Sequence, residues 1–525
     1  MNTMTLPCPQ PFHVFDTTLR DGAQQEGLQL SVYDKLRIAG LIDELGVTFI
    51  EGGWPGANPS DTEFFAAAAR DLHLKNATLV AFGATRRVGM TAATDPLTQA
   101  LLDAGTEVVC LVAKSHDRHV FQALKTTLEE NLEMIRDTVT YLRAHDRRVF
   151  VDCEHFFNGY LDNPTYAKLV VATAAEAGAE VAVLCDTNGG MLPAMVREIV
   201  EDVYKLGVPL GIHCHNDTGC AVANTLAGVE AGVMHVQGTI NGYGERTGNA
   251  DLTTIIANLK LKHRWDVVSD EALRDLTRIA HSVAEIANQV PAARQPYVGI
   301  SSFAHKAGLH ASAIKVDANL YQHIDPELVG NDMRMLISDM AGRANIQIKA
   351  GQLGHDVSDR TIAARLADTV KAKEAEGYSY EAADASFDLL VRAELGLDVA
   401  PFTIAGWRVF TDQEEDSQGV VRVGFADEAP RPYVGEGNGP VNALDQALRQ
   451  ALTPHYPQMA GVELSDYRVR LLDNGHGTDA ITRVLIDTRA GLKTWTTVGV
   501  GENVIEASWE ALVEAYTYAL TVVLP

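Results

Sequence analysis

The stretch VFDTTLRDG, residues 14–22, joins a strand-like run to a pair of charged residues. Val14 and Phe15 predict a buried strand that Gly22 ends, so Arg20 and Asp21 fall where the strand opens into a loop. A carboxylate can hold a divalent metal, and an adjacent guanidinium can neutralise an oxyanion that forms beside it. An isolated Arg–Asp pair is more often a weak surface ion pair. The residues that other strands bring to the same point therefore decide between the two interpretations.

The composition indicates a soluble globular protein with more than one domain. The chain has 525 residues, of which 46% are apolar and 21% charged, and two or three domains are expected at this length. The formal charge of −26, without a basic run, argues against a nucleic-acid or membrane partner. No leader segment and no apolar run of about 18 residues is evident. Six cysteines without framework spacing predict reduced thiols and a cytoplasmic protein.

The first half of the chain alternates strand-like runs with amphipathic helical segments. The first such helix has Ser31 as its predicted N-cap, with Asp34 three residues on and Gly46 at its end. Eight units of this kind in roughly 240 residues favour a parallel (β/α)8 TIM barrel over an open doubly wound sheet. The eight predicted strands are 13–17, 47–51, 77–83, 107–113, 148–154, 181–186, 210–215 and 235–240.

Polar side chains follow the predicted strands where a barrel of this type carries its active site. His213 and His215 are two residues apart, so on a strand both point to one face, while Cys214 points away and is excluded as a ligand. With Asp21 and one more oxygen donor they form a mixed N/O site that suits Mg²⁺, Mn²⁺ or Zn²⁺ as a Lewis acid. The other strand ends carry Glu51, Glu154, the run Asp186-Thr187-Asn188 and the segment 241–249.

The glycines at 242, 244 and 248 raise the question of a dinucleotide-binding loop. That interpretation fails, because the third glycine of a G-x-G-x-x-G motif would fall at Thr247 and the segment follows the eighth strand instead of the first. We interpret the glycines as a tight loop that orients Asn249.

The motifs Arg20-Asp21-Gly22, Glu51, His213-x-His215 and 242–249 resemble the DRE-TIM metallolyase superfamily. Within it the sequence is similar to the 2-isopropylmalate, homocitrate and citramalate synthases over nearly its whole length. The resemblance implies a divalent metal, Mg²⁺ or Mn²⁺ with Zn²⁺ as the alternative. It also implies residue roles: Asp21, His213, His215 and Asn249 hold the metal, Arg20 contacts a 2-oxo acid with Glu51 as its buried partner, Glu154 lies near the substrate, and the Thr187 hydroxyl contacts the substrate carboxylate.

Beyond about residue 260 the β/α alternation stops. Residues 269–289 predict a helix with Ser269 as its N-cap, and 353–398 predict a helical linker. The family resemblance implies that His310 and Tyr321, with Asn319 close by, reach into the barrel of the partner subunit and assist proton transfer. Many relatives carry aspartate where this chain has Ser312, so the proton-transfer network is open at this point.

The C-terminal part contains an internal duplication. Its two copies, 434–448 and 498–512, share a V-G-x-G run leading to matching alanines, 64 residues apart. A glycine-rich turn before a helix can bind a carboxylate, although two purely structural turns are the equal alternative. The resemblance implies an α+β regulatory domain that dimerises and binds an end-product amino acid, isoleucine or leucine. The candidate effector residues are Gly435, Gly437, Gly499 and Gly501.

These patterns predict three parts: a barrel over 1–285, a helical linker over 286–400 and a regulatory domain over 401–525. The resemblance implies an acyltransferase of isoleucine biosynthesis, a homodimer that condenses acetyl-CoA with a 2-oxo acid and hydrolyses the thioester. The run 52–59 is similar to the citramalate synthase branch, so pyruvate is the expected oxo acid and citramalate the product. The base is either Glu154 or His310 with Tyr321. The alternatives are 2-isopropylmalate synthesis from 2-oxoisovalerate, a retro-aldol or Claisen lyase, and an inactive amino-acid sensor.

Overall fold

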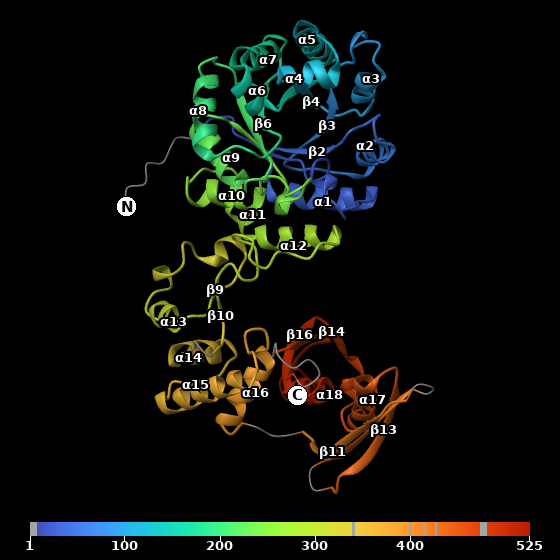
Figure 1. The fold of residues 1–525 in the computed structure, drawn as a ribbon, viewed down its shortest axis with the longest axis vertical. Helices are drawn as coiled ribbons and strands as arrows, with labels where there is room; N and C mark the ends of the chain where they lie inside the picture. Colours follow the sequence, from blue (N-terminus) through green and yellow to red (C-terminus); the bar gives the residue numbers. More distant parts are fainter. Residues whose placement is uncertain are drawn as a thin grey trace. The chain divides into compact units, whose positions relative to one another are not determined.

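The computed structural model describes residues 8–338, 342–397, 401–412, 416–425, 428–472 and 480–524. The chain forms two compact units (Figure 1). The first comprises Met1–Phe303 with Asp325–Asp332, and the second Ala304–Ile324 with Met333–Pro525.

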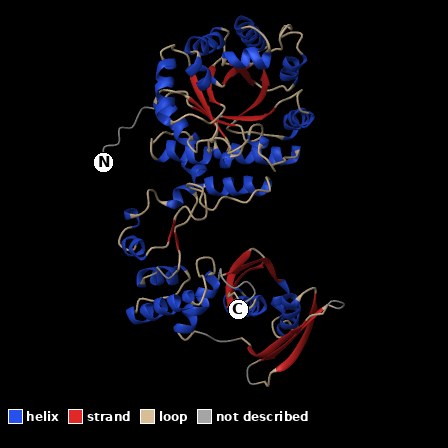
Figure 2. Ribbon diagram, in the orientation of Figure 1, coloured by secondary structure: helices blue, strands red, loops and turns tan. Residues whose placement is uncertain are grey.

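The first unit is a closed barrel of eight parallel strands, as predicted, and Figure 2 shows the strands enclosed by helices. The strands are β1 (His13–Asp16), β2 (Phe49–Gly53), β3 (Thr78–Ala84), β4 (Val108–Lys114), β5 (Arg148–Glu154), β6 (Val181–Asp186), β7 (Leu210–Cys214) and β8 (His235–Gly238). The helices that follow them in turn are α1 (Val32–Leu45), α2 (Pro59–Asp71), α3 (Pro96–Asp103), α5 (Leu128–Ala144), α7 (Pro164–Glu176), α8 (Pro193–Tyr204), α9 (Ala221–Glu230) and α10 (Leu252–Leu261).

Local sequence explains the first β/α unit. Ser31 and Asp34 form a reciprocal capping box at the start of α1, and Gly46 ends the helix in a left-handed conformation. Ile38 and Ile42 on the inner face are fully buried. Capping and periodicity therefore give the same boundaries as the structure.

Aromatic side chains fill the interior of the barrel near the ends at which the strands begin. The rings of Phe49 and Phe150 pack edge to face with centroids 5.0 Å apart, and Phe15 packs against both of them and against His235. Because this part is packed with buried side chains, the polar residues gather at the carboxyl ends of the strands.

The helix predicted over 269–289 is two helices, α11 (Asp270–Arg274) and α12 (Leu276–Ile286). Ser269 caps the first, as expected, by accepting a hydrogen bond from the N–H of Ala272. The single-helix prediction is wrong because Asp275, with φ −90° and ψ −2°, is a turn residue that separates the two helices. The Asp275 carboxylate forms an ion pair with Arg278, three residues later.

The second unit begins with a helical region. It contains the short strands β9 (Ala304–His305) and β10 (Arg334–Met335) and the helices α13 (Gly308–Ile314), α14 (Arg343–Gln352), α15 (Arg360–Ala375) and α16 (Asp384–Glu394). The helical linker predicted over 353–398 is therefore two helices. Ile346, Leu366 and Phe387 contribute to their shared apolar core.

The rest of the second unit repeats one arrangement twice, which confirms the duplication. Each copy is a three-stranded antiparallel sheet followed by a helix. The first copy is β11 (Thr403–Phe410), β12 (Ser417–Gly424), β13 (Arg431–Gly437) and α17 (Pro440–Leu452). The second is β14 (Val462–Leu471), β15 (Thr482–Ala490), β16 (Lys493–Gly501) and α18 (Val504–Tyr518).

The four candidate effector glycines lie within the strands β13 and β16, so the prediction of a glycine-rich turn at these positions is wrong. A Cβ at Gly435 would approach the backbone of Ala443 and Ala447 to 2.5 Å or less, and one at Gly499 would meet the backbone of Ala507 at 2.0 Å. Close packing of strand on helix is therefore one physical reason for these glycines. Their predicted effector role is untested by this geometry.

Among the helices of the described residues, none combines the length and the apolar character needed to cross a membrane.

Candidate active site

Asp21, His213 and His215 converge at the barrel mouth. The Asp21 Oδ2 atom lies 3.2 Å from His213 Nε2 and 3.6 Å from His215 Nε2. One ligand atom from each residue lies within 4.8 Å of the others, and all three residues are buried. Cys214 lies between the histidines, and its thiol is hydrogen-bonded to Thr225 of α9 on the outer side of the strand. The exclusion of this thiol as a ligand therefore agrees with the structure.

Asn249 is brought to the same place by the loop after β8. It pairs with His215 in an isolated β-bridge, and its Nδ2 donates to the carbonyl of Tyr243 at 3.0 Å. Its buried Oδ1 has no hydrogen-bond partner among the described residues. Gly244 has φ +151°, and a Cβ there would lie 2.2 Å from Asn249 Nδ2, so the loop needs glycine to hold the amide in this orientation.

These residues fit a divalent cation. One carboxylate oxygen, two imidazole nitrogens and one unsatisfied amide oxygen make the mixed N/O donor set that Mn²⁺, Mg²⁺ and Zn²⁺ accept. An amide oxygen buried without a partner is costly unless a ligand satisfies it.

The tautomer of His213 is set by two residues that the sequence analysis missed. Gln237 of β8 donates through Nε2 to Asp152 Oδ1 at 2.9 Å, so its Oε1 accepts from His213 Nδ1, also at 2.9 Å. The proton on Nδ1 leaves Nε2 free to act as a ligand. The available signal was strand alternation, since Asp152 is two residues before Glu154 and so points into the same barrel.

The electrostatics of the cluster shift the pKa values of the two histidines in opposite directions. Burial opposes the charged imidazole, but the hydrogen bond and negative charge of Asp21 raise the pKa of His213 above its ordinary value. Burial and the neighbouring His213 lower the pKa of His215 to about 4. A cation bound here would therefore compete with a proton at His213.

Arg20 is fixed on three sides. Its Nε donates to Glu51 Oε2 at 2.6 Å, and its Nη1 lies 3.4 Å from Asp21 Oδ1. The guanidinium carbon lies 3.9 Å from the centre of the Phe82 ring. Glu51 is fully buried and also accepts from the Thr17 hydroxyl at 2.5 Å. Burial raises the pKa of Glu51, which Arg20 opposes.

A second buried group, Glu51, Cys110 and Asp152, also has its ligand atoms within 4.8 Å of one another. Its carboxylates are already hydrogen-bonded, Glu51 to Arg20 and Asp152 to Gln237. Burial raises the pKa of Cys110 well above its usual range, so the thiol stays protonated. We therefore assign this group to positioning instead of metal binding.

Glu154 and Thr187 complete the polar side of the site. Glu154 forms an ion pair with Lys114. The Thr187 hydroxyl accepts from the backbone N–H of His155 at 2.8 Å, and Arg246 donates to the Thr187 carbonyl at 2.9 Å. Both residues line a cavity of about 220 Å³ together with Arg20, Asp21, His213 and His215.

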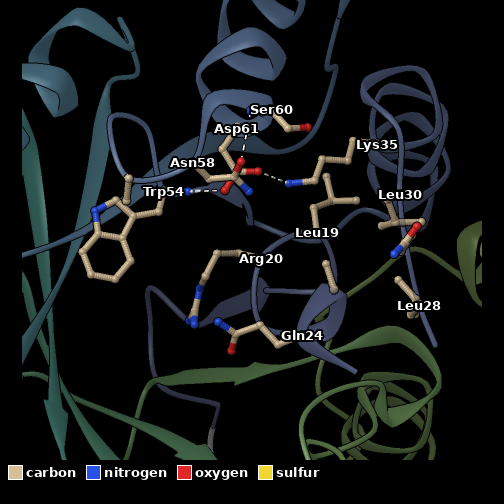
Figure 3. Close-up of a pocket in the computed structure, with 13 residues that line it drawn as sticks. Leu19, Arg20, Gln24, Leu28, Leu30, Lys35, Trp54, Asn58, Ser60 and Asp61 are labelled. Carbon is tan, nitrogen blue, oxygen red and sulfur yellow. Dashed lines mark hydrogen bonds and ion pairs between the residues drawn. The ribbon is translucent and has the colours of Figure 1, made fainter. Parts of the chain in front are cut away.

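A larger cavity of about 500 Å³ adjoins the first (Figure 3). The two share Arg20, Gln24 and Trp54 as lining residues. The larger cavity combines leucine side chains with the polar side chains of Asn58 and Ser60. A molecule with both apolar and amide groups fits such a lining.

The remaining predicted residues lie in the second unit. The rings of His310 and Tyr321 stack with centroids 4.0 Å apart and planes at 28°, so the structure brings these two together. Asn319 is exposed, and its backbone and side-chain amides donate to Asp317. The Ser312 hydroxyl donates to the carbonyl of Gly308. Their role in proton transfer stays a prediction.

Three protein families match successive parts of the chain. The HMGL-like family matches residues 11–283, the homocitrate synthase post-HMGL domain-like family 297–377, and the LeuA allosteric (dimerisation) domain 381–520. The solved structure of Bacillus subtilis HMG-CoA lyase, 18% identical, covers 55% of this chain and 97% of its own, with a TM-score of 0.47.

The HMGL-like match spans more than half of the chain and gives the class of protein: a TIM-barrel enzyme with an HMGL-like catalytic domain and a LeuA regulatory domain. An (R)-citramalate synthase of Streptomyces coelicolor is 59% identical over 99% of this chain and 98% of its own, and one of Synechocystis sp. is 48% identical over 97% and 96%. A probable 2-isopropylmalate synthase of Methanopyrus kandleri is 32% identical over 96% and 97%. The chain belongs to the (R)-citramalate synthase family.

Proposed function

We propose that this protein is an (R)-citramalate synthase. It condenses acetyl-CoA with pyruvate and hydrolyses the thioester, releasing citramalate and CoA. The observation that carries the proposal is the 59% identity to the S. coelicolor (R)-citramalate synthase along the whole chain. The donor set beside Arg20 at the barrel mouth supplies the matching chemistry.

Asp21, His213, His215 and Asn249 would hold a divalent cation, Mg²⁺ or Mn²⁺ with Zn²⁺ as the alternative, which supplies Lewis-acid polarisation of the 2-oxo acid. Arg20 binds the oxo acid beside this position and stabilises the negative charge that develops on its keto oxygen. Glu51 and Phe82 hold the guanidinium in place, so little reorganisation is needed during the reaction. The Thr187 hydroxyl binds the carboxylate of the oxo acid.

A base must remove a proton from the methyl group of acetyl-CoA, and the resulting enolate then attacks the ketone of the oxo acid. Glu154 is one candidate, because its carboxylate lines the cavity that Arg20 lines. His310 with Tyr321 is the other, with Asn319 as a neighbouring substrate contact, and the stacking of the two rings supports a shared role. The acyl donor enters through the larger cavity, which ends at Arg20 and Trp54.

The regulatory part of the proposal is an enzyme of isoleucine biosynthesis that is inhibited by isoleucine or leucine. The match to the LeuA allosteric (dimerisation) domain supports both this effector and a homodimer. We place the effector near Gly435, Gly437, Gly499 and Gly501. All six cysteines are free, which supports a cytoplasmic protein.

The domain bounds 1–285, 286–400 and 401–525 are part of this proposal. The family matches support three parts but start the last one at residue 381. The earlier start agrees with a contact in the structure: the Ser386 hydroxyl of α16 donates to Glu514 of α18, so the last linker helix contacts the regulatory repeat.

One assay tests the proposed function. Thiol release from acetyl-CoA is followed with pyruvate, 2-oxobutyrate and 2-oxoisovalerate, with and without a chelator. The proposal expects chelator-sensitive release with pyruvate as the preferred oxo acid and citramalate as the product. A preference for 2-oxoisovalerate would instead support 2-isopropylmalate synthesis, the activity named for the M. kandleri relative.

A further inference from the structure

The smaller cavity has an apolar wall as well as a polar one. Trp54, Phe82 and Val112 are among the residues that line it. The rings of Trp54 and Phe82 pack edge to face with centroids 5.3 Å apart, and the Arg20 guanidinium lies over the Phe82 ring. Trp54 is the largest side chain on this wall, and the proposed metal, oxyanion and carboxylate contacts do not use it.

The strand order places Trp54 at the far end of the substrate. In the closed barrel β2 and β6 are four strands apart in either direction, so Trp54 after β2 and Thr187 after β6 lie on opposite sides of the mouth. A 2-oxo acid with its carboxylate at Thr187 and its keto oxygen beside Arg20 therefore points its carbon-3 group toward Trp54. This step rests on the proposed function.

Trp54 is held by a buried ion pair (Figure 3). Its backbone N–H donates to Asp61 Oδ2 at 2.9 Å, while Asp61 Oδ1 accepts from Lys35 Nζ at 2.6 Å. Lys35 also donates to the carbonyl of Gly52 at 3.0 Å. Both charged residues are buried, with 4% of Lys35 and 7% of Asp61 exposed.

The local sequence is adapted to this clamp. Gly53 has φ +150°, and a Cβ there would lie 2.5 Å from the carboxylate carbon of Asp61. The approach of α2 to the end of β2 therefore requires glycine directly before Trp54. Breaking a buried ion pair by removing one partner is strongly destabilising, so the position of Trp54 is coupled to the integrity of α1 and α2.

We propose that Trp54, fixed by the buried Lys35–Asp61 pair, sets the upper size limit on the carbon-3 group of the 2-oxo acid. The methyl group of pyruvate fits between Trp54 and Arg20, whereas the isopropyl group of 2-oxoisovalerate meets the indole. Trp54 is thus a specificity-determining residue, and Lys35 and Asp61 are positioning residues.

The test compares wild type with Trp54→Leu and Trp54→Phe. Thiol release at saturating acetyl-CoA gives kcat/KM for pyruvate, 2-oxobutyrate and 2-oxoisovalerate. Because one methylene in a pocket changes selectivity about 10–200-fold, the ratio of 2-oxoisovalerate to pyruvate should rise at least tenfold in Trp54→Leu, with 2-oxobutyrate in between. A ratio within twofold of wild type overturns the proposal. So does loss of turnover with every oxo acid in a variant that retains its circular dichroism spectrum.

Trp265→Phe is the matched control. Trp265 is 3% exposed and packs edge to face on Phe12, directly before β1 and so at the opposite end of the barrel. Trp265→Phe removes the same side-chain volume as Trp54→Phe, but the ratio of kcat/KM for 2-oxoisovalerate to that for pyruvate should not change. The double variant Lys35→Met with Asp61→Asn removes the ion pair without stranding a buried charge. It should broaden selectivity while Trp54 is still present, and an unchanged ratio in a folded double variant contradicts the positioning role.

Failure of this proposal is distinct from failure of the proposed function. If wild type releases no thiol with pyruvate, both the proposed function and the proposed size limit are wrong. If wild type prefers pyruvate and the Trp54 variants keep the same ratio, only the size limit is wrong.

Discussion

His213 Nε2 lies 3.2 Å from Asp21 Oδ2, although one residue belongs to β7 and the other follows β1. This contact joins the two ends of the barrel sequence at a single point, next to His215 and Asn249. Burial lowers the pKa of His213, but the hydrogen bond and negative charge of Asp21 raise it above its ordinary value. The same geometry suits a divalent cation that both side chains bind.

Replacing His213 with alanine should abolish Mn²⁺ binding and turnover without unfolding the barrel. The reason is that only three other donors remain, and the Asp21 carboxylate loses its closest partner. Isothermal titration with Mn²⁺ and the thiol-release assay measure the two effects. Cys214→Ala is the control, because this neighbouring thiol is directed to α9. Turnover at wild-type level in His213→Ala would refute the metal assignment.

Gln237→Leu should weaken Mn²⁺ binding about 10–100-fold, the usual effect of losing an outer hydrogen bond to a metal-binding histidine. Leucine keeps the volume but cannot accept from His213 Nδ1, so the imidazole tautomer is no longer fixed. The measurement is a Mn²⁺ titration. Gln99→Leu on the exposed face of α3 serves as the control. Unchanged Mn²⁺ affinity in Gln237→Leu would refute the role of Asp152 and Gln237 in fixing the His213 tautomer.

Arg20→Lys should lower kcat/KM for pyruvate about 10²–10³-fold, the effect of losing one preorganised donor to a developing oxyanion. Lysine keeps the charge but lacks the planar fork that binds Glu51 and faces Phe82. Steady-state kinetics with pyruvate measure the loss, and Arg70→Lys on the exposed surface should have no effect. A decrease below threefold would contradict the oxyanion role.

The two candidate bases give different results in a deuterium-exchange experiment. Replacing the true base should lower the rate of exchange of the acetyl methyl protons with solvent about 10²–10⁴-fold. This rate is measured by mass spectrometry in the presence of an oxo acid. We compare Glu154→Gln with His310→Ala and Tyr321→Phe. If exchange falls only in Glu154→Gln, the His310–Tyr321 pair is not the base. If it falls only in the other two variants, Glu154 is not.

Glu514 predicts a pH dependence of stability in the second unit. Burial, together with the charge of Glu510, raises the pKa of Glu514 from 4.5 to about 7 in the folded protein, against a hydrogen bond from Ser386. Because the folded-state pKa is above the unfolded value, the protonated form stabilises the fold. This contribution is complete below about pH 4.5 and is lost as the pH rises through about 7. The shift corresponds to about 3 kcal/mol at most.

The corresponding measurement is the Tm of wild type and Glu514→Gln between pH 5 and pH 8. Glutamine stays neutral, so the variant should gain stability relative to wild type as the pH increases. Glu502→Gln, at an exposed position before α18, should follow wild type throughout. A constant difference between wild type and Glu514→Gln would contradict the raised pKa.

Sequence patterns predicted the elements that depend on local signals. Short strand-like runs predicted the eight strands and the Ser31–Asp34 capping box predicted the first helix, because both signals involve neighbouring residues. The break at Asp275 was missed, because the apolar periodicity of 269–289 continues through the single turn residue that separates the two helices.

The metal-binding histidines were visible from their spacing, but the residues that support them were not. Gln237 and Asp152 act through each other across three strands, and no single run of sequence contains that relationship. The Lys35–Asp61 pair was missed for the same reason, because its members lie on different helices. Pairings of this kind follow from the closure of the barrel and from the packing of helices around it.

The central claim is that Asp21, His213, His215 and Asn249 hold one divalent cation beside Arg20. Anomalous diffraction at the manganese edge, from crystals grown with Mn²⁺ and pyruvate, tests it most directly. We predict a single strong peak within bonding distance of those four side chains, with pyruvate between the peak and Arg20. A peak elsewhere, or no peak at the barrel mouth in crystals of active protein, would contradict it.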